Sequence, residues 1–329
     1  MNATKNELLV ALNYLGEFPK ETLKKQELME KLNEIYDGNQ EQLAIVINTE
    51  IYDLIKKLVK ADKNGIDVEK EYESEVEFLQ GALIIEEPII TNQKIHIKFN
   101  EGMEEKLSKF INNRDQEVIN KNQVIIDIMI NILDVYGMIQ DYEMLYMLNK
   151  FLKMNMSMEI VLGLVNYQID LRNEIVIGEA EDEDEIYFMN NLVDHPEDIV
   201  YEKESRNLDY KEYTLQELEK YSYENIIDCK EAQEVLKFLK KKKIEYAEEL
   251  TMTMILHFMC EPKLDLNDFR KLIKIDFEDI NEGNEYLQVI MNLHNNVPHY
   301  ALYGYSPNEL FKIQIEKQKK AEEKRKKRK

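Results

Sequence analysis

The sequence is short of the residues that build several common classes of protein. Cys229 and Cys260 are the only cysteines among 329 residues, which excludes a scaffold held together by disulfides. Ten glycines and six prolines are too few for a turn-rich β-sandwich, whereas leucine, isoleucine, glutamate and lysine are abundant. No apolar run approaches the roughly 20 residues that a membrane-spanning helix requires. The composition therefore predicts a mainly α-helical protein with no membrane partner.

The first twenty residues, MNATKNELLVALNYLGEFPK, lack the features of a secretory signal. Their apolar stretch is short, contains Asn13 and follows Glu7 instead of a basic cluster. Two cysteines without a disulfide framework also suit a reducing compartment. We therefore expect a cytoplasmic location.

Positive charge is scarce and is concentrated at one end of the chain. There are 43 lysines and arginines against 65 aspartates and glutamates, a net charge of −22. An apolar fraction of 44% is still enough to bury a core, so this is not the composition of a disordered acidic protein. Residues 312–329 contain ten basic residues and three glutamates, which leaves the rest of the chain strongly acidic.

This basic tail, residues 312–329, is where the sequence allows a nucleic-acid contact, because an acidic body repels the phosphate backbone. Its candidate contact residues are Lys324, Arg325, Lys326, Lys327, Arg328 and Lys329. The tail has no interleaved aromatic residues, and it also has the composition of a solvated, frayed helix end. Both interpretations stay open on the sequence.

The pattern of the first third of the chain predicts a winged helix. Thr4 and Glu7 form a capping box that opens an N-terminal helix within residues 1–19. Further helices are expected up to about residue 36, over 43–58 and over 68–80, and short strands at 82–87 and 95–99. Helices followed by two short strands around a loop give the order of a winged helix. We therefore expect a winged-helix-like module over residues 20–112.

The same order of elements recurs in the next segment, which predicts a second winged-helix-like module over residues 113–180. Helices are expected at 118–136, 141–153 and 157–165, and strands at 167–171 and 174–177. Residues 179–185 hold six carboxylates without the glycine or the spacing of a calcium loop, so they indicate a solvated linker. We place that acidic linker at 181–212, an α-helical domain at 213–311 and the basic tail after it.

One segment near the C-terminus resembles a known group of proteins. Residues 291–311 read MNLHNNVPHYALYGYSPNELF, and they resemble an N-N-T-x-x-W-x-x-x-G-x-T-P-x-E-L segment of uncharacterised proteins from low-GC bacteria. In that group the segment ends a helical domain and often precedes a SEC-C-type zinc tail. This chain has Val297-Pro298 in place of the threonine and Tyr300 in place of the tryptophan. It has no cysteine-rich run after Leu310, so the resemblance implies no zinc tail and no activity.

The same residues also make physical sense without the resemblance. Ser306, Pro307 and Glu309 predict a capping box at the start of a last helix, and Gly304 permits the turn before it. One interpretation is a well-specified corner of the fold. The other is a partner-docking surface that would be built from Tyr300, Tyr303 and Tyr305.

The motifs of common enzyme classes are absent. The sequence has no G-x-x-x-x-G-K-[ST] or G-x-G-x-x-G phosphate loop, no H-E-x-x-H and no G-x-S-x-G. His257, Cys260, His294 and His299 would be the only zinc set, and their spacing is loose for a zinc site. We therefore expect no catalytic, cofactor-binding or metal-ligating residues, and a protein that is not an enzyme.

The expected recognition helices also lack the residues that read DNA. Residues 68–80 contain five glutamates against one lysine, and residues 157–165 contain no basic residue. Because winged helices also dock proteins, we expect a cytoplasmic protein-interaction or adaptor protein with an unknown protein partner. The alternatives are a transcription-type regulator that uses the basic tail, and an acidic protein that mimics nucleic acid or inhibits an enzyme acting on it.

Overall fold

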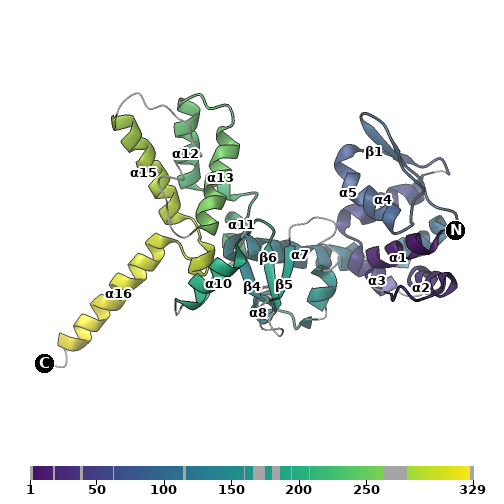
Figure 1. The fold of residues 1–329 in the computed structure, drawn as a ribbon, viewed down its shortest axis with the longest axis horizontal. Helices are drawn as coiled ribbons and strands as arrows, with labels where there is room; N and C mark the ends of the chain where they lie inside the picture. The colour runs from purple at the N-terminus through teal and green to yellow at the C-terminus, as the bar shows by residue number, and fades with distance from the viewer. Residues whose placement is uncertain are drawn as a thin grey trace. The chain divides into compact units, whose positions relative to one another are not determined.

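The chain folds into two compact units in a computed structural model, drawn in Figure 1. The structure describes residues 3–17, 19–37, 40–61, 63–113, 116–158, 160–165, 175–179, 186–193, 195–206, 208–261 and 280–326. Unit 1 comprises Met1–Asp127 and Lys153–Val176, and unit 2 comprises Ile128–Leu152 and Ile177–Lys329. The fold is mainly helical with two small three-stranded sheets, which confirms the expected fold class at this coarse level. In the described part of the chain, no helix is both long and apolar enough to span a bilayer.

Unit 1 is a helical body that carries one small sheet. Its helices are α1 (Lys5–Tyr14), α2 (Lys25–Asp37), α3 (Gln40–Val46), α4 (Thr49–Lys60), the 3₁₀ helix η1 (Lys70–Tyr72), α5 (Glu73–Gly81), α6 (Met103–Asn113) and the start of α7 (Gln116–Tyr136). Its strands are β1 (Ile66–Glu69), β2 (Ile89–Ile90) and β3 (Lys94–Ile97). The predicted capping box of α1 is confirmed, because the Glu7 N–H donates to Thr4 Oγ1 at 3.3 Å and the Thr4 N–H to Glu7 Oε2 at 2.6 Å.

The sheet of unit 1 is antiparallel, with β3 between β1 and β2. Ile95 and Ile97 are buried in the core, and His96 between them points to the other face, where Asp67 lies 2.7 Å from it. The alternation in the sequence thus marks a strand with one buried face, as expected. The adjacent Ile89 and Ile90 are 64% and 60% exposed on the edge strand β2.

Three expected elements of unit 1 differ in the structure. The single helix expected over 43–58 is interrupted, because Asn48 caps α4 by accepting a 2.7 Å hydrogen bond from the Ile51 N–H. The helix expected over 68–80 begins only at Glu73, since residues 66–69 pair with β3 as a strand. The strand expected at 82–87 is reduced to an isolated bridge between Ile85 and Phe99.

Unit 2 contains the rest of α7 and most of the second half of the chain. Its other helices are α8 (Asp141–Leu152), α10 (Pro196–Glu204), α11 (Leu215–Lys220), η2 (Ile226–Asp228), α12 (Lys230–Lys241), α13 (Ala247–Cys260), α15 (Ile280–Asn296), η3 (Tyr300–Leu302) and α16 (Pro307–Lys326). Figure 1 shows α12, α13 and α15 side by side, and they enclose the main apolar core of the unit. Thr214 and Glu217, three residues apart in the sequence, form a capping box at the start of α11.

The second sheet consists of β4 (Met138–Gln140), β5 (Ile175–Glu179) and β6 (Ile186–Asn190), with β6 in the middle. Strand β4 pairs antiparallel with β6, and Ile139 faces Phe188 across this pairing. The strand expected at 167–171 lies outside the described residues, as do residues 180–185 of the acidic run. The segment 181–212, expected as a linker, contains strand β6 and helix α10.

Candidate functional site

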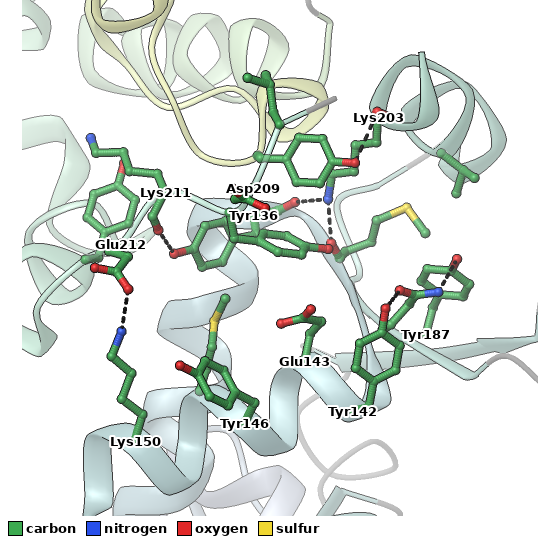
Figure 2. A pocket seen from close by; sticks show the side chains of 18 of the residues that line it. Tyr136, Tyr142, Glu143, Tyr146, Lys150, Tyr187, Lys203, Asp209, Lys211 and Glu212 are labelled. Carbon is green, nitrogen blue, oxygen red and sulfur yellow. Dashed lines mark hydrogen bonds and ion pairs between the residues drawn. The ribbon is translucent and has the colours of Figure 1, made fainter. Parts of the chain in front are cut away.

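Unit 2 contains a pocket of about 540 Å³ whose walls are rich in tyrosine. The tyrosines that line it are Tyr136, Tyr142, Tyr146, Tyr187, Tyr210, Tyr213 and Tyr303. Figure 2 shows that the pocket lies between helix α8 on one side and the segment that carries Asp209, Lys211 and Glu212 on the other. Tyrosine combines a large apolar ring with a polar hydroxyl, and for that reason it is enriched in surfaces that bind other proteins.

Helix α8 supplies the exposed wall of the pocket. Tyr142, Tyr146 and Lys150 recur at intervals of four residues and so share one face of the helix. Met144 and Leu148 lie on the opposite face and are fully buried, which fixes the rotation of the helix. The rings of Tyr142 and Tyr146 are consequently 58% and 61% exposed.

A chain of hydrogen bonds holds the ring of Tyr142 in place. The Tyr142 hydroxyl donates to Gln140 Oε1, and Gln140 Nε2 donates to the Tyr187 hydroxyl at 3.1 Å. Gln140 and Tyr187 face each other in the pairing of β4 with β6. The second sheet therefore orients an exposed aromatic ring at the mouth of the pocket.

Lys203 is a buried cation at the back of the pocket. Only 7% of it is exposed, and its Nζ donates to the carbonyl oxygens of Met138 at 2.7 Å and Tyr136 at 3.3 Å. Tyr136 is the last residue of α7, so the ammonium satisfies a carbonyl at the negative end of the helix dipole. Desolvation lowers the pKa of Lys203 to about 7, while these carbonyl oxygens favour the charged form.

The rings of Tyr210 and Tyr303 cover the same ammonium group. Lys203 Nζ lies 5.1 Å and 5.3 Å from the centroids of the two rings, within the range of a cation–π interaction. The two rings meet edge to face, with centroids 5.0 Å apart. The Tyr303 hydroxyl also donates to the Lys203 carbonyl oxygen at 3.1 Å. These contacts fix the inner end of the pocket.

Backbone contacts fix the wall opposite α8. The Tyr136 hydroxyl donates to the Lys211 carbonyl at 2.6 Å, and the Lys211 N–H donates to the Tyr303 carbonyl at 3.0 Å. The Tyr213 hydroxyl donates to the Gly304 carbonyl at 2.7 Å. Residues 209–213 are therefore held between the end of α7 and the corner that precedes α16.

The charges around the pocket are only partly matched. Lys150 Nζ lies 2.9 Å from Glu212 Oε1, and Lys211 Nζ lies 2.7 Å from Glu309 Oε1. No ion-pair partner is found among the described residues for the three remaining carboxylates, those of Glu143, Glu204 and Asp209. Figure 2 shows the Glu143 carboxylate pointing from α8 toward the interior of the pocket. The pocket consequently has an excess of negative charge.

The three tyrosines expected at a docking surface occupy different environments. Tyr300 is 1% exposed and lies in the core, where its ring packs against the backbone of Gly137. Tyr303 has a left-handed backbone, with φ of 55°, and lines the pocket. Tyr305 is half-buried at the corner, and its carbonyl accepts a 3.2 Å hydrogen bond from the His299 N–H. Of the three, the structure therefore brings Tyr303 to the pocket.

The corner itself is built as the sequence predicts. The Ser306 N–H donates to Glu309 Oε2 at 2.9 Å, and the Glu309 N–H donates to Ser306 Oγ at 3.4 Å, which is the capping box. Gly304 has φ of 80°, and a Cβ there would lie 2.7 Å from the ring of Tyr136. Asn296 accepts a hydrogen bond from Asn308 Nδ2 at 3.1 Å, which ties α15 to α16.

Two of the four histidines of unit 2, His294 and His299, form a buried pair. His299 Nε2 lies 2.8 Å from the His294 carbonyl oxygen, and the two rings are 4.8 Å apart. Burial lowers the pKa of both, that of His299 to about 4, and thus favours the neutral form of each ring. His257 and Cys260 line a separate pocket of about 590 Å³. No group of three potential ligands with metal-binding geometry occurs within the described residues.

The candidate nucleic-acid residues lie at the end of the last helix. Lys324, Arg325 and Lys326 are in the final turn of α16, which Figure 1 shows in yellow, running away from the α12, α13 and α15 bundle. Lys327, Arg328 and Lys329 lie outside the described residues.

Comparison with known protein families, with curated proteins and with solved structures gave no match for this chain.

Proposed function

We propose that the protein is an interaction module that docks a segment of a partner protein in the tyrosine-lined pocket of unit 2. The observation that carries the proposal is the pair Tyr142 and Tyr146, which are large aromatic rings kept exposed on a helix whose other face is fully buried. Tyrosine is enriched among the residues that dominate binding energy at protein interfaces. A pocket of about 540 Å³ also has the size at which proteins hold small molecules or single side chains.

We further propose that both small sheets belong to winged-helix-like modules. In each, the middle strand of the sheet is the last of the three in the sequence: β3 lies between β1 and β2, and β6 between β4 and β5. A helix precedes each first strand, and helical residues follow it: η1 and α5 after β1, and α8 after β4. Helix α5 carries three glutamates and no basic residue, and α8 carries Asp141 and Glu143 against Lys150. Docking of protein therefore fits these helices better than contact with phosphate.

The test is affinity capture from an extract of the cells in which the chain is expressed. Wild-type chain, the Tyr142→Ser/Tyr146→Ser variant and a chain lacking residues 312–329 are compared. We expect the wild type and the truncated chain to retain the same partner and the double variant to lose it. Capture that depends on the tail and is abolished by nuclease would instead favour the nucleic-acid regulator.

A matched control separates loss of docking from loss of folding. Tyr201 and Tyr246 are 73% and 58% exposed in the same unit and do not line the tyrosine pocket. The Tyr201→Ser/Tyr246→Ser variant should keep the partner, since it removes the same chemical groups elsewhere on the unit. Equal loss in both double variants would contradict the assignment of the pocket.

A further inference from the structure

The tyrosine pocket has an electrostatic character that selects its occupant. Of the three lysines on its walls, Lys150 and Lys211 are each matched by a carboxylate, and Lys203 is committed to two backbone carbonyls. An anionic ligand would therefore have to break an existing ion pair before it could contact a cation of the pocket. A cationic ligand could contact the unpaired carboxylates without breaking an ion pair.

Three carboxylates of the pocket lie close enough to its tyrosines to act on them. The pKa of Tyr210 is raised by desolvation and additionally by the charge of Glu143. The pKa of Tyr303 is raised by desolvation and additionally by the charges of Glu204 and Asp209. The negative field of these side chains thus reaches the aromatic rings that line the space.

The unit already holds cations against tyrosine rings. Besides Lys203, the Nζ of Lys211 lies 4.2 Å from the centroid of the Tyr213 ring. An aromatic face flanked by carboxylates is the environment that guanidinium and ammonium groups prefer, because ring and carboxylate both attract positive charge. At the mouth of the pocket, the exposed rings of Tyr142 and Tyr146 lie beside Glu143 and give the same combination of aromatic face and carboxylate.

We infer that the pocket binds an arginine or lysine side chain carried by a basic segment of a partner protein. The cationic group lies among the carboxylates of Glu143, Glu204 and Asp209, and its aliphatic part packs on the rings of Tyr142 and Tyr146. Arginine binds more tightly than lysine, since its planar guanidinium stacks on tyrosine and can engage a carboxylate with two hydrogen bonds. This inference rests on the proposed function and specifies the chemistry of the partner.

The experiment measures the binding of fluorescent peptides to the full chain by anisotropy. The probes are four Gly/Ser-rich dodecapeptides that each carry three copies of one residue: arginine, lysine, citrulline or glutamate. We expect the order arginine, lysine, then citrulline, with no binding of the glutamate peptide. Raising the salt concentration should weaken binding of the first two peptides and leave citrulline unaffected.

A pair of variants localises the binding and removes the effect of net charge. The Glu143→Gln/Asp209→Asn variant should bind the arginine peptide at least about ten-fold more weakly, because two of the three unpaired carboxylate charges of the pocket are lost. Glu101→Gln/Glu104→Gln removes the same amount of charge from exposed positions in unit 1 and should leave affinity within about two-fold. Thermal unfolding followed by circular dichroism verifies that both variants are folded.

Each contrary result has a separate meaning. Equal affinity in the two variants would show that basic peptides bind only to the overall negative charge, and it would overturn the inference. Equal affinity for the arginine and citrulline peptides would overturn the selection of a cation while leaving a docking pocket in place. Absence of peptide binding, combined with partner capture that is lost in Tyr142→Ser/Tyr146→Ser, would leave the proposed function standing and this inference refuted.

One further experiment tests whether the occupant of the pocket is a segment of another protein or of a second copy of this chain. Sedimentation equilibrium of the full chain is compared with that of a chain ending at residue 311. A monomer in both cases agrees with a segment of another protein as the occupant. Self-association that disappears with the basic tail and in Glu143→Gln/Asp209→Asn would identify the tail of a second copy instead, and it would overturn the assignment to a foreign partner.

Discussion

The two small sheets have the same strand order and carry different side chains. After β1, helix α5 begins with Glu73, Ser74 and Glu75, and its buried residues are Val76, Phe78 and Leu79. After β4, helix α8 buries Met144, Met147 and Leu148 and presents Tyr142 and Tyr146 to solvent. Both helices thus use one face for the core, and they differ in what the other face offers. A repeated arrangement of elements therefore does not by itself give two surfaces the same chemistry.

The positions of the polar groups around the two sheets also differ. In unit 1 the polar contacts of the sheet are on its exposed face, such as that between His96 and Asp67. In unit 2 the interior contains polar groups, among them Lys203 and the buried Asp134, which accepts a 2.8 Å hydrogen bond from Asn190 Nδ2. Buried polar groups impose a single arrangement when each has a partner. Unit 2 can therefore hold the tyrosine side chains of its pocket in fixed positions.

The largest effect on stability is expected on substitution of Gly137, and Gly102 of unit 1 serves as its control. Gly137 and Gly102 have similar positive φ, 71° and 82°, but a Cβ at Gly137 would lie 2.3 Å from the ring of Tyr300, whereas nothing lies within 4 Å of one at Gly102. A left-handed backbone alone costs a non-glycine residue about 1–2 kcal/mol. Because Tyr300 is fixed in the core, overpacking adds about 1–3 kcal/mol at Gly137.

We therefore expect Gly137→Ala to lower the free energy of unfolding by about 3 kcal/mol or more, and Gly102→Ala by about 1–2 kcal/mol. Urea denaturation followed by circular dichroism measures both. Equal losses would mean that Tyr300 can move away, and that the end of α7 is not as tightly packed as described.

The next largest effect is the pH dependence of the free energy of unfolding that arises from Lys203. Its pKa in the folded chain is about 7, whereas a lysine of the unfolded chain titrates near about 10.4. Between these values the unfolded state binds more protons, so the free energy of unfolding rises with pH, by at most about 1.4 kcal/mol per pH unit. Below about pH 7 both states are protonated and this contribution no longer changes.

We expect the difference in unfolding free energy between wild type and Lys203→Met to grow by about 2 kcal/mol from pH 7 to pH 9. Lys150→Met is the control, because the hydrogen bond to Glu212 raises the pKa of Lys150, and its curve should run parallel to wild type over this range. A Lys203→Met curve that is also parallel would show that the carbonyl oxygens keep the lysine fully charged above pH 9.

Features that depend on residues close together in the sequence could be predicted from it, whereas features that depend on distant residues could not. The capping boxes at Thr4, Thr214 and Ser306 were predictable, because each involves residues three apart in the sequence. The division of the 43–58 helix at Asn48 was not, since an apolar stripe continues on both sides of the cap. Strand β6 was not predicted, because it follows a run of carboxylates that indicates a linker.

The pocket depends on contacts that no local pattern contains. Tyr142 and Tyr146 do give a signal, an aromatic pair four residues apart opposite buried methionines, but the sequence does not say what they face. Lys203 reaches the end of α7 from more than sixty residues away, at Met138 and Tyr136. A lysine in a charged helix is ordinarily exposed, so its burial follows only from the tertiary structure.

A smaller effect is expected at the two capping boxes that open α1 and α16. Thr4 is exposed, whereas Ser306 is 3% exposed, and its partner Glu309 also pairs with Lys211. Loss of a cap costs about 0.5–2 kcal/mol, and the cost is higher where the freed N–H is buried. We expect Ser306→Ala to cost about 1–2 kcal/mol and Thr4→Ala about 0.5–1 kcal/mol in thermal or urea unfolding. The reverse order would contradict the burial of the corner.

The smallest effect on stability is expected at the exposed apolar pairs of the two units. Ile89 and Ile90 on β2, like Tyr142 and Tyr146 on α8, are more than half exposed. Replacing either pair with serine should change the free energy of unfolding by no more than about 0.5 kcal/mol, because little buried surface is lost.

The pairs should differ in binding, since only the tyrosines line a pocket that carries charge and fixed polar groups. We expect the Ile89→Ser/Ile90→Ser variant to retain the captured partner and to bind the arginine peptide. The Tyr142→Ser/Tyr146→Ser variant should lose both. Loss of binding in the isoleucine variant alone would move the docking surface to the edge of the first sheet.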